Sequence, residues 1–178
     1  MRKKILFLAG MMACCSLAGA QEISKTWVAD KGNGTYQNPV LHADYSDPDV
    51  CAAGDDFYMT ASSFNCIPGI PILHSNDLVN WSLVNYALPI QEPEEFFDKA
   101  QHGKGVWAPA IRFHNGEFYI FWGDPDQGAF MVKARDPKGP WSEPVLVKPG
   151  KGIIDTCPLW DEDGKVSVSY THLTLPTT

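Results

Sequence analysis

The chain has 178 residues and a formal net charge of −7, with 44% hydrophobic, 12% aromatic and 20% charged residues. This length is enough for one domain with a sizeable core, and the composition is that of a globular protein. The acidic balance argues against nucleic acid or an anionic membrane surface as a partner, because both carry negative charge.

The first twenty residues have the three parts of an export signal. A basic start at residues 2–4 precedes an apolar segment at 5–13 and a small-residue cleavage site at 18–20. The apolar segment is too short to span a bilayer. We therefore predict a signal peptide and a periplasmic or secreted protein. A lipoprotein signal that ends before Cys14 or Cys15 is the alternative.

The rest of the chain has the pattern of an all-β protein. Residues 21–37 are a polar lead-in segment. From Asn38 onward, short apolar or alternating segments are separated by turn signals about every ten residues, and no stretch keeps a helical period.

A weak internal repeat organises these segments. Residues 46–60, 107–121 and 155–166 each contain a proline near the start of a strand and a glycine-containing turn six or seven residues later. The turns are Gly54-Asp55, Asn115-Gly116 and Asp163-Gly164. Asn-Gly and Asp-Gly are strong hairpin signals, because these residues tolerate positive φ angles.

The first two repeat units also end alike. Trp81-Ser82 and Trp141-Ser142 are sixty residues apart, and each pair follows a turn. One unit therefore holds about four strands, which is the content of a β-propeller blade. A β-sandwich would not explain a repeated Trp-Ser pair at this spacing.

The chain holds two such blades and the start of a third, whereas propellers close with roughly four to eight blades. We therefore expect it to be the N-terminal part of a longer parent protein and to fold poorly by itself, with an unpaired blade edge. Residues 168–177 resemble the translation of a sequencing adapter. We predict that residues 167–178 are a non-native tail and that His172 is no ligand.

Three cysteines follow the signal: Cys51, Cys66 and Cys157. Their spacing matches no zinc-binding pattern. An oxidising compartment permits a Cys51–Cys66 disulfide, but the odd number argues against a disulfide framework. We expect buried free thiols.

The repeat predicts where a functional site lies. In a propeller, the first strand of each blade lies nearest the central channel, so side chains at the starts of these strands converge at one mouth. The three units deliver Asp47, Trp107 and Asp155 there. Two acids beside an aromatic wall suit the cleavage of a glycosidic bond, because one carboxylate activates water and a carboxylic acid protonates the leaving oxygen.

Each of these residues also has a simpler interpretation. Asp47 precedes Pro48, and Asp beside Pro is typical of turns. Trp107 has the character of a core residue. Asp155 opens an apolar strand, which is costly unless the acid is paired or used.

Several motifs resemble glycoside hydrolase family 43. They are Asn38-Pro39-Val40-Leu41, Tyr45-Ser46-Asp47-Pro48-Asp49-Val50, and the segments 54–64, 68–81 and 105–119. The last two are similar to the β-xylosidase and α-L-arabinofuranosidase members. The resemblance covers residues 38–166, which we interpret as part of a catalytic domain.

This resemblance implies a five-bladed β-propeller and an inverting mechanism. Asp47 matches the general base of the family, and Asp155 matches the acid that orients the general acid and raises its pKa. Phe64 and Trp107 match aromatic residues of the sugar pocket. The general acid is a Glu in a later blade, and no residue of this chain matches it, so we expect this chain alone to be inactive.

The resemblance also implies the substrates: terminal or branch xylose and arabinose units of plant hemicellulose oligosaccharides. It implies no cofactor, although a channel metal held by a later histidine occurs in the family. Two alternatives are a non-catalytic carbohydrate-binding propeller, and a propeller hydrolase that retains the anomeric configuration.

Overall fold

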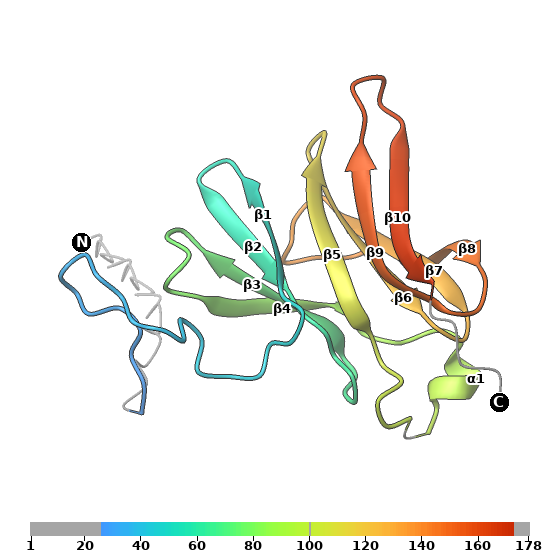
Figure 1. The fold of residues 1–178 in the computed structure, drawn as a ribbon, viewed down its shortest axis with the longest axis horizontal. Coiled ribbons are helices and arrows are strands. Elements are labelled where there is room, and N and C mark those ends of the chain that lie inside the picture. The colour runs from blue at the N-terminus through green and yellow to red at the C-terminus, as the bar shows by residue number, and fades with distance from the viewer. Residues whose placement is uncertain (1–25, 100, 173–178) are drawn as a thin grey trace, which may run out of the picture.

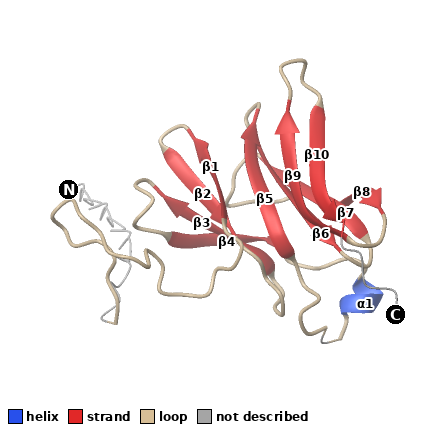
Figure 2. Ribbon diagram, in the orientation of Figure 1, coloured by secondary structure: helices blue, strands red, loops and turns tan. Residues whose placement is uncertain are grey.

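The computed structural model describes residues 26–99 and 101–172. The predicted signal peptide lies outside these residues, as do residues 21–25 of the lead-in and 173–178 of the predicted tail. In the described part, ten strands form three antiparallel sheets, and the only helix is α1 (Glu94–Phe97) (Figures 1 and 2). No helix among these residues is long and apolar enough to cross a membrane. The prediction of an all-β fold is confirmed.

Two of the sheets have four strands, each paired in sequence order. The first contains β1 (Asp49–Ala53), β2 (Asp56–Thr60), β3 (Gly69–Ser75) and β4 (Ser82–Leu88). The second contains β5 (Trp107–His114), β6 (Glu117–Asp124), β7 (Gly128–Ala134) and β8 (Val145–Pro149). The third has only β9 (Ile153–Trp160) and β10 (Val166–His172). These are the two blades and the start of a third that the repeat predicts.

The core lies between the first two blades. Apolar side chains from both sheets form one buried cluster, which includes Ile72 of β3, Ile111 of β5 and Trp122 of β6. Trp122 is 2% exposed, and its ring stacks on Phe130 of β7 with centroids 5.4 Å apart. The inner parts of β3, β6 and β7 are therefore buried almost continuously between the blades.

Two of the three predicted turns are two-residue hairpin connections, as predicted. Asn115 and Gly116 have φ angles of 49° and 79° and join β5 directly to β6. Gly54, with a φ angle of 65°, lies in the two-residue connection from β1 to β2. The third connection is longer than a two-residue turn: residues 161–165 join β9 to β10, and the Asp161 N–H donates to the Lys165 carbonyl.

The repeated Trp-Ser pair has the same structural role in both blades. The Trp81 indole N–H donates to the Leu78 carbonyl at 3.0 Å, and the Trp141 indole N–H donates to the Pro137 carbonyl at 3.1 Å. Each tryptophan therefore closes the turn that precedes the last strand of its blade.

Strand β10 includes part of the predicted tail. Residues 167–172 pair with β9 along most of their length. Strand pairing uses backbone groups that every residue except proline carries, so it does not identify the origin of these residues. Their non-native origin stays a prediction.

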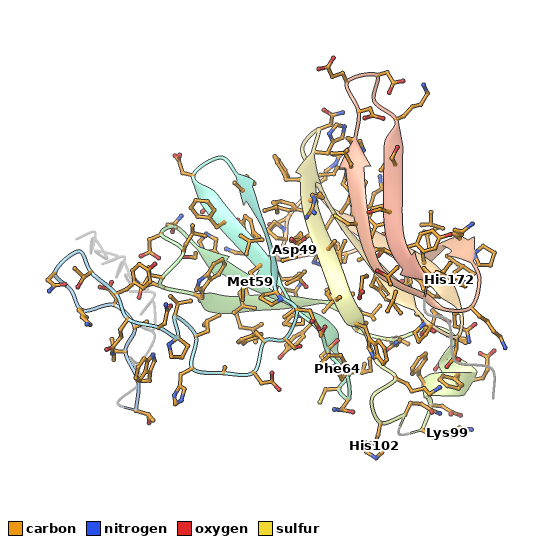
Figure 3. All side chains as sticks on the ribbon, viewed as in Figure 1. Asp49, Met59, Phe64, Lys99, His102 and His172 are labelled. Carbon is orange, nitrogen blue, oxygen red and sulfur yellow. The ribbon has the colours of Figure 1, made fainter. Side chains whose placement is uncertain are left out.

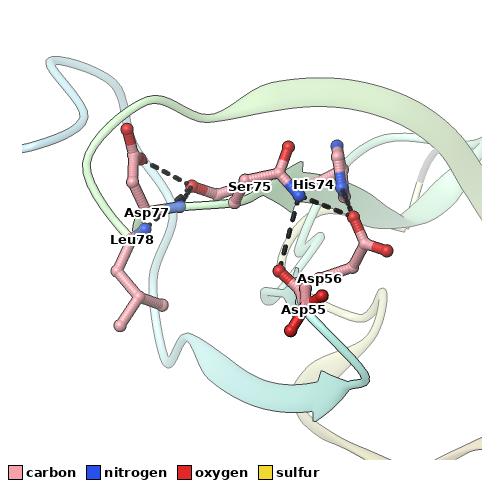
Figure 4. Close-up of polar contacts among 7 residues, drawn as sticks. Asp55, Asp56, His74, Ser75, Asp77 and Leu78 are labelled. Carbon is pink, nitrogen blue, oxygen red and sulfur yellow. Dashed lines mark hydrogen bonds and ion pairs between the residues drawn. The ribbon is translucent and has the colours of Figure 1, made fainter.

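The turn between β3 and β4 is held by one carboxylate (Figure 4). Asp77 Oδ1 accepts hydrogen bonds from the backbone N–H groups of Asn80 at 2.7 Å and Val79 at 2.9 Å. The Ser75 hydroxyl donates to the same oxygen at 3.0 Å and accepts from the Leu78 N–H. The bonds from the backbone and side chain of Asn80, with those from Val79 and Ser75, hold the pKa of Asp77 well below its usual range.

The lowered pKa of Asp77 predicts how its contribution to the unfolding free energy changes with pH. A carboxyl group whose pKa is lowered by folding stabilises the native state above its unfolded pKa, and this contribution is lost as the pH falls towards the folded value. Because Asp77 is exposed, we expect Asp77→Ala to lower the unfolding free energy by only about 1 kcal/mol at neutral pH. The difference should shrink steadily below about pH 4. Urea unfolding of both proteins across this range measures it, and a difference independent of pH would contradict the assignment.

Candidate active site

The first strands of the three blades lie side by side and run in the same direction. β5 packs against both β1 and β9, and all three arrows point to the top of Figure 1. The beginnings of these strands therefore lie at one end of the molecule. Asp47 comes two residues before β1, Trp107 begins β5 and Asp155 is the third residue of β9. Asp47, Trp107 and Asp155 therefore lie at or near the starts of the three inner strands.

The backbone marks one equivalent position in each blade. Asp47, Ala108 and Asp155 have φ angles of 51°, 37° and 53°, a left-handed conformation that is uncommon for residues other than glycine. Around Ala108 and Asp155 the strand pairing is irregular, as in a β-bulge. Bulges redirect side chains and occur often beside active sites. Both acids therefore have a left-handed backbone conformation, and the irregular pairing of a bulge surrounds Asp155.

This geometry corrects the register that the prolines suggested. The residue equivalent to the two acids in the second blade is Ala108, and Trp107 precedes it by one position. In the first two units, a proline directly follows the left-handed residue. In the third unit, Pro158 comes three residues after Asp155, so an alignment of the units by their prolines gives the wrong register.

Asp47 is held by two serine hydroxyls. Ser62 and Ser46 donate to Asp47 Oδ2 at 2.7 Å and 3.0 Å. The Ser62 hydroxyl also accepts from the Ala108 N–H at 2.8 Å, so it ties the acid of the first blade to the inner strand of the second. Oδ1 of Asp47 accepts no hydrogen bond from the described residues, and the residue is exposed. Ser62 was not predicted, because its role depends on a neighbouring blade.

Asp155 is exposed, and its carboxylate forms no hydrogen bond or ion pair with the described part of the chain. Its neighbour Thr156 is 1% exposed and belongs to the buried face of β9. Asp155 therefore lies on the opposite face, where its charge remains hydrated and available to a group from outside these three sheets.

The two predicted pocket aromatics are in contact. The rings of Phe64 and Trp107 meet edge to face, with centroids 6.3 Å apart at 73°. The Trp107 indole N–H donates to the Gly103 carbonyl at 2.8 Å, and the Gly105 N–H donates to the Phe64 carbonyl at 2.9 Å. Both side chains are half-buried, so part of each ring is open to a sugar ring.

A guanidinium group connects the inner strands of all three blades. Asp49 Oδ2 of β1 accepts from the backbone N–H of Ile111 at 2.8 Å and from Arg112 Nη1 at 2.5 Å, both on β5. Arg112 Nη2 donates to Cys157 Sγ of β9 at 3.0 Å. These contacts fix the relative positions of the strands that carry the two acids.

Removing this guanidinium should loosen the blades. We expect Arg112→Met to lower the unfolding free energy of the parent protein by about 1–3 kcal/mol, because Asp49 then loses a charged partner. The matched control is Arg135→Met, whose side chain is 88% exposed and 4.0 Å from Glu117, and whose loss should stay within about 0.5 kcal/mol. Chemical denaturation measures both, and equal losses would contradict a role for Arg112 between blades.

The described cysteines are free thiols, as expected, but only Cys51 is partly buried. Cys51 is half-buried, and burial raises the pKa of its thiol to about 12. Cys66 and Cys157 are exposed, so the prediction that they are buried is wrong. Cys66 lies in the loop between β2 and β3, and Cys157 lies on the exposed face of β9.

The described residues contain no group of three or more His, Cys, Asp or Glu side chains arranged to hold a metal ion. The described residues therefore offer no set of ligands for the channel metal that the resemblance suggested, and no reaction step is assigned to a metal.

Within residues 26–99 and 101–172, buried side-chain polar groups without partners occur at three residues: Thr60, Gln91 and Thr156. Gln91 differs from the other two because both its amide nitrogen and its amide oxygen are unpaired. A buried polar group without a partner costs about 1–3 kcal/mol. Gln91 therefore carries the largest unpaired polar group among these three.

The repeated antiparallel sheets are those of a β-propeller protein, and two acids, Asp47 and Asp155, lie near the starts of its inner strands. Comparison with known proteins agrees: residues 36–172 match the sequence model described as Glycosyl hydrolases family 43. The chain belongs to this family, and it forms part of a five-bladed propeller.

The relatives include a putative beta-xylosidase of Xylanibacter ruminicola, 39% identical over 82% of this chain and 27% of the relative. A non-reducing end alpha-L-arabinofuranosidase of Bacteroides ovatus is 41% identical over 68% of this chain and 23% of its own length. Among solved structures, the GH43 protein BlXynB of Bacillus licheniformis matches with a TM-score of 0.67 and 32% identity, over 76% of this chain and 29% of that one. The chain spans about a quarter of the length of these relatives.

Proposed function

We propose that the parent protein is a glycoside hydrolase that releases terminal or branch xylose or arabinose units from hemicellulose oligosaccharides, with inversion at the anomeric carbon. The observation that carries the proposal is the pair of acids, Asp47 and Asp155, which both have a left-handed backbone conformation near the starts of parallel inner strands. The family supports the reaction class, and the names of relatives as xylosidases and arabinofuranosidases support the sugars.

In this mechanism, Asp47 is ionised and acts as the general base. The Ser46 and Ser62 hydroxyls hold one of its carboxylate oxygens, which leaves the other to accept a proton from water. The oxygen of that water attacks the anomeric carbon as the glycosidic bond breaks. A Glu from a later blade donates its proton to the leaving oxygen.

The other residues prepare this reaction. Asp155 orients the general acid, and its negative charge raises the pKa of that acid, so that it stays protonated. The base and the acid need a separation of about 6.5–9.5 Å, which leaves room for the water. Phe64 and Trp107 offer aromatic surface to the sugar ring.

Proton NMR of the first product tests the stereochemistry. An inverting enzyme releases the opposite anomer to that of the substrate, and release of the same anomer would overturn the mechanism. A panel of para-nitrophenyl xylosides and arabinosides identifies the sugar. Binding of xylo-oligosaccharides without any hydrolysis by the parent protein would favour the alternative, a non-catalytic carbohydrate-binding propeller.

We also propose that the parent protein is exported to the periplasm or the medium. The basic, apolar and small-residue order of the first twenty residues supports this proposal. N-terminal sequencing of the mature protein should begin at Gln21. A lipid-modified cysteine at position 14 or 15 would instead identify a lipoprotein.

A further inference from the structure

A short backbone junction joins the first two blades beside the candidate base. Ser63, in the loop after β2, and Val106, just before β5, form an isolated antiparallel β-bridge. The Ser63 N–H donates to the Val106 carbonyl at 2.9 Å, and the Val106 N–H donates to the Ser63 carbonyl at 3.0 Å. Figure 3 shows Phe64, the next residue, at the end of the molecule where β5 begins. Residues 62–64 and 105–108, with this bridge at their centre, form the inter-blade junction.

The junction holds groups of the candidate site on both sides of the bridge. On one side, the Ser62 hydroxyl donates to Asp47 at 2.7 Å. On the other side, Phe64 contacts the ring of Trp107, and its carbonyl accepts from the Gly105 N–H at 2.9 Å. The proposed base and the aromatic pair are therefore attached to the same three consecutive residues, 62–64.

The two segments approach each other most closely at Gly105. A Cβ atom there would stand 2.1 Å from the Ser63 carbonyl oxygen and 2.8 Å from the carbonyl carbon and oxygen of Phe64. These are backbone atoms of the bridge itself, so they cannot move aside without breaking its hydrogen bonds. Val106, the next residue, is 0% exposed, and a close-packed interior offers it no space into which to shift. The absence of a side chain at Gly105 therefore sets the spacing between the two segments.

The Ser63 hydroxyl holds the other side of the junction. It accepts a hydrogen bond from the Ile70 N–H at 3.1 Å. Ile70 is 0% exposed and has a φ angle of 56°, a left-handed conformation that is rare for a β-branched residue. Such backbone strain persists only where the surrounding contacts over-determine it, and it clusters at functional sites. Ser63 therefore ties the loop to its own blade through its side chain and to the next blade through its backbone.

We propose that Ser63 and Gly105 are positioning residues of the active site, and that the inter-blade junction sets the distance between the base and the aromatic pair. A sugar ring on the aromatic pair and a water molecule on the base react only in a narrow range of distances and angles, so both supports have to be fixed to one another. This inference rests on the proposed function, because it takes that base and that aromatic pair as assigned. Neither positioning residue touches the substrate.

Gly105→Ala in the parent protein should lower kcat and raise KM together. We expect kcat/KM to fall by about 10²-fold, the effect of a misplacement of about 1 Å. The matched control is Gly116→Ala in the β5–β6 hairpin, where φ is 79° and the Cβ position is open space. This control should lower the Tm through local backbone strain and keep the wild-type kcat/KM. Steady-state kinetics on a para-nitrophenyl glycoside and thermal unfolding measure both variants.

Ser63→Ala is the milder test and serves if Gly105→Ala does not fold. It leaves the buried Ile70 N–H without its acceptor and should lower kcat/KM by about ten-fold, again through both kcat and KM. Ser63→Thr keeps the hydroxyl and should restore most of this loss. The control is Asn85→Ala, which removes another contact between the two blades, from Asn85 Nδ2 to the Lys138 carbonyl at 2.9 Å. A lower Tm with an unchanged kcat/KM in both alanine variants would show a purely structural role and overturn the proposal.

Hydrolysis by the wild-type parent protein tests the proposed function separately. Wild-type hydrolysis with unchanged kcat/KM in folded Gly105→Ala and Ser63→Ala would overturn the role of the junction alone. If the wild type binds xylose without hydrolysing glycosides, calorimetric titration with xylose replaces the kinetics. Weaker xylose binding by Gly105→Ala than by Gly116→Ala would then support the junction and refute the enzyme. Equal affinities in these two variants, or no sugar binding by the wild type, would overturn both proposals.

Discussion

Asp47→Asn in the parent protein is expected to lower kcat by about 10²–10⁴-fold, the usual contribution of a general base. Asparagine has nearly the same shape as aspartate and still accepts hydrogen bonds from Ser46 and Ser62 through its amide oxygen. It accepts no proton from water at neutral pH. The fold and the affinity for xylo-oligosaccharides should therefore remain, and only turnover should fall.

The matched control is Asp161→Asn, an exposed acid in the β9–β10 connection, at the opposite end of the strand pair from Asp155 (Figure 1). It should leave kcat unchanged. Initial rates on a para-nitrophenyl glycoside measure both variants, with circular dichroism as the check on folding. Wild-type turnover by a folded Asp47→Asn protein would remove Asp47 as the base.

Gly123→Ala should damage stability and activity together. Gly123 lies on β6 beside the start of the third blade, and a Cβ atom there would stand 2.6 Å from both the Ile153 carbonyl oxygen and Ile154 Cα. These are backbone atoms, which rotate away less readily than a side chain. The added methyl group should push β9 away from β6, at a cost of about 1–3 kcal/mol in unfolding free energy.

The displacement of β9 has a functional consequence, because Asp155 follows directly after Ile154. A shift of about 1 Å in a catalytic group costs about 10²-fold in rate. We therefore expect kcat/KM to fall by about this factor. Urea unfolding and steady-state kinetics measure the two effects on the same protein.

Gly164→Ala is the control that separates a general loss of stability from a displacement of Asp155. Gly164 has a φ angle of 78° in the β9–β10 connection, and its Cβ position is open space. The substitution should cost about 1 kcal/mol through backbone strain alone. Its kcat/KM should stay at the wild-type value. A similar loss of activity in both variants would mean that general destabilisation, rather than displacement of Asp155, explains the effect of Gly123→Ala.

The repeat predicted the blades because its signals are local. A glycine with positive φ at a hairpin, and a tryptophan that closes the turn before the last strand, depend only on residues nearby in the chain. Asn115-Gly116 and the Trp81 and Trp141 indoles act in this way.

The contacts between blades were not predictable in the same way. The Ser62 hydroxyl connects Asp47 to Ala108, and Arg112 connects Asp49 to Cys157. The longest separations in sequence are 46 residues for the serine contacts and 63 residues for the arginine contacts. A single sequence contains no signal for such pairs. The register of the third unit was also missed, because a left-handed residue within a bulge leaves no fixed proline spacing.

The sequence by itself therefore determined the all-β class, the four-strand unit, the family and the candidate residues Asp47, Asp155, Phe64 and Trp107, because each rests on motifs or periods readable within a few residues. Only the tertiary structure decided that the two acids both have a left-handed backbone, that Ser46 and Ser62 hold Asp47, and that Arg112 connects the inner strands. These features arise where separate blades pack together, and the geometry of that packing is a property of the folded chain as a whole.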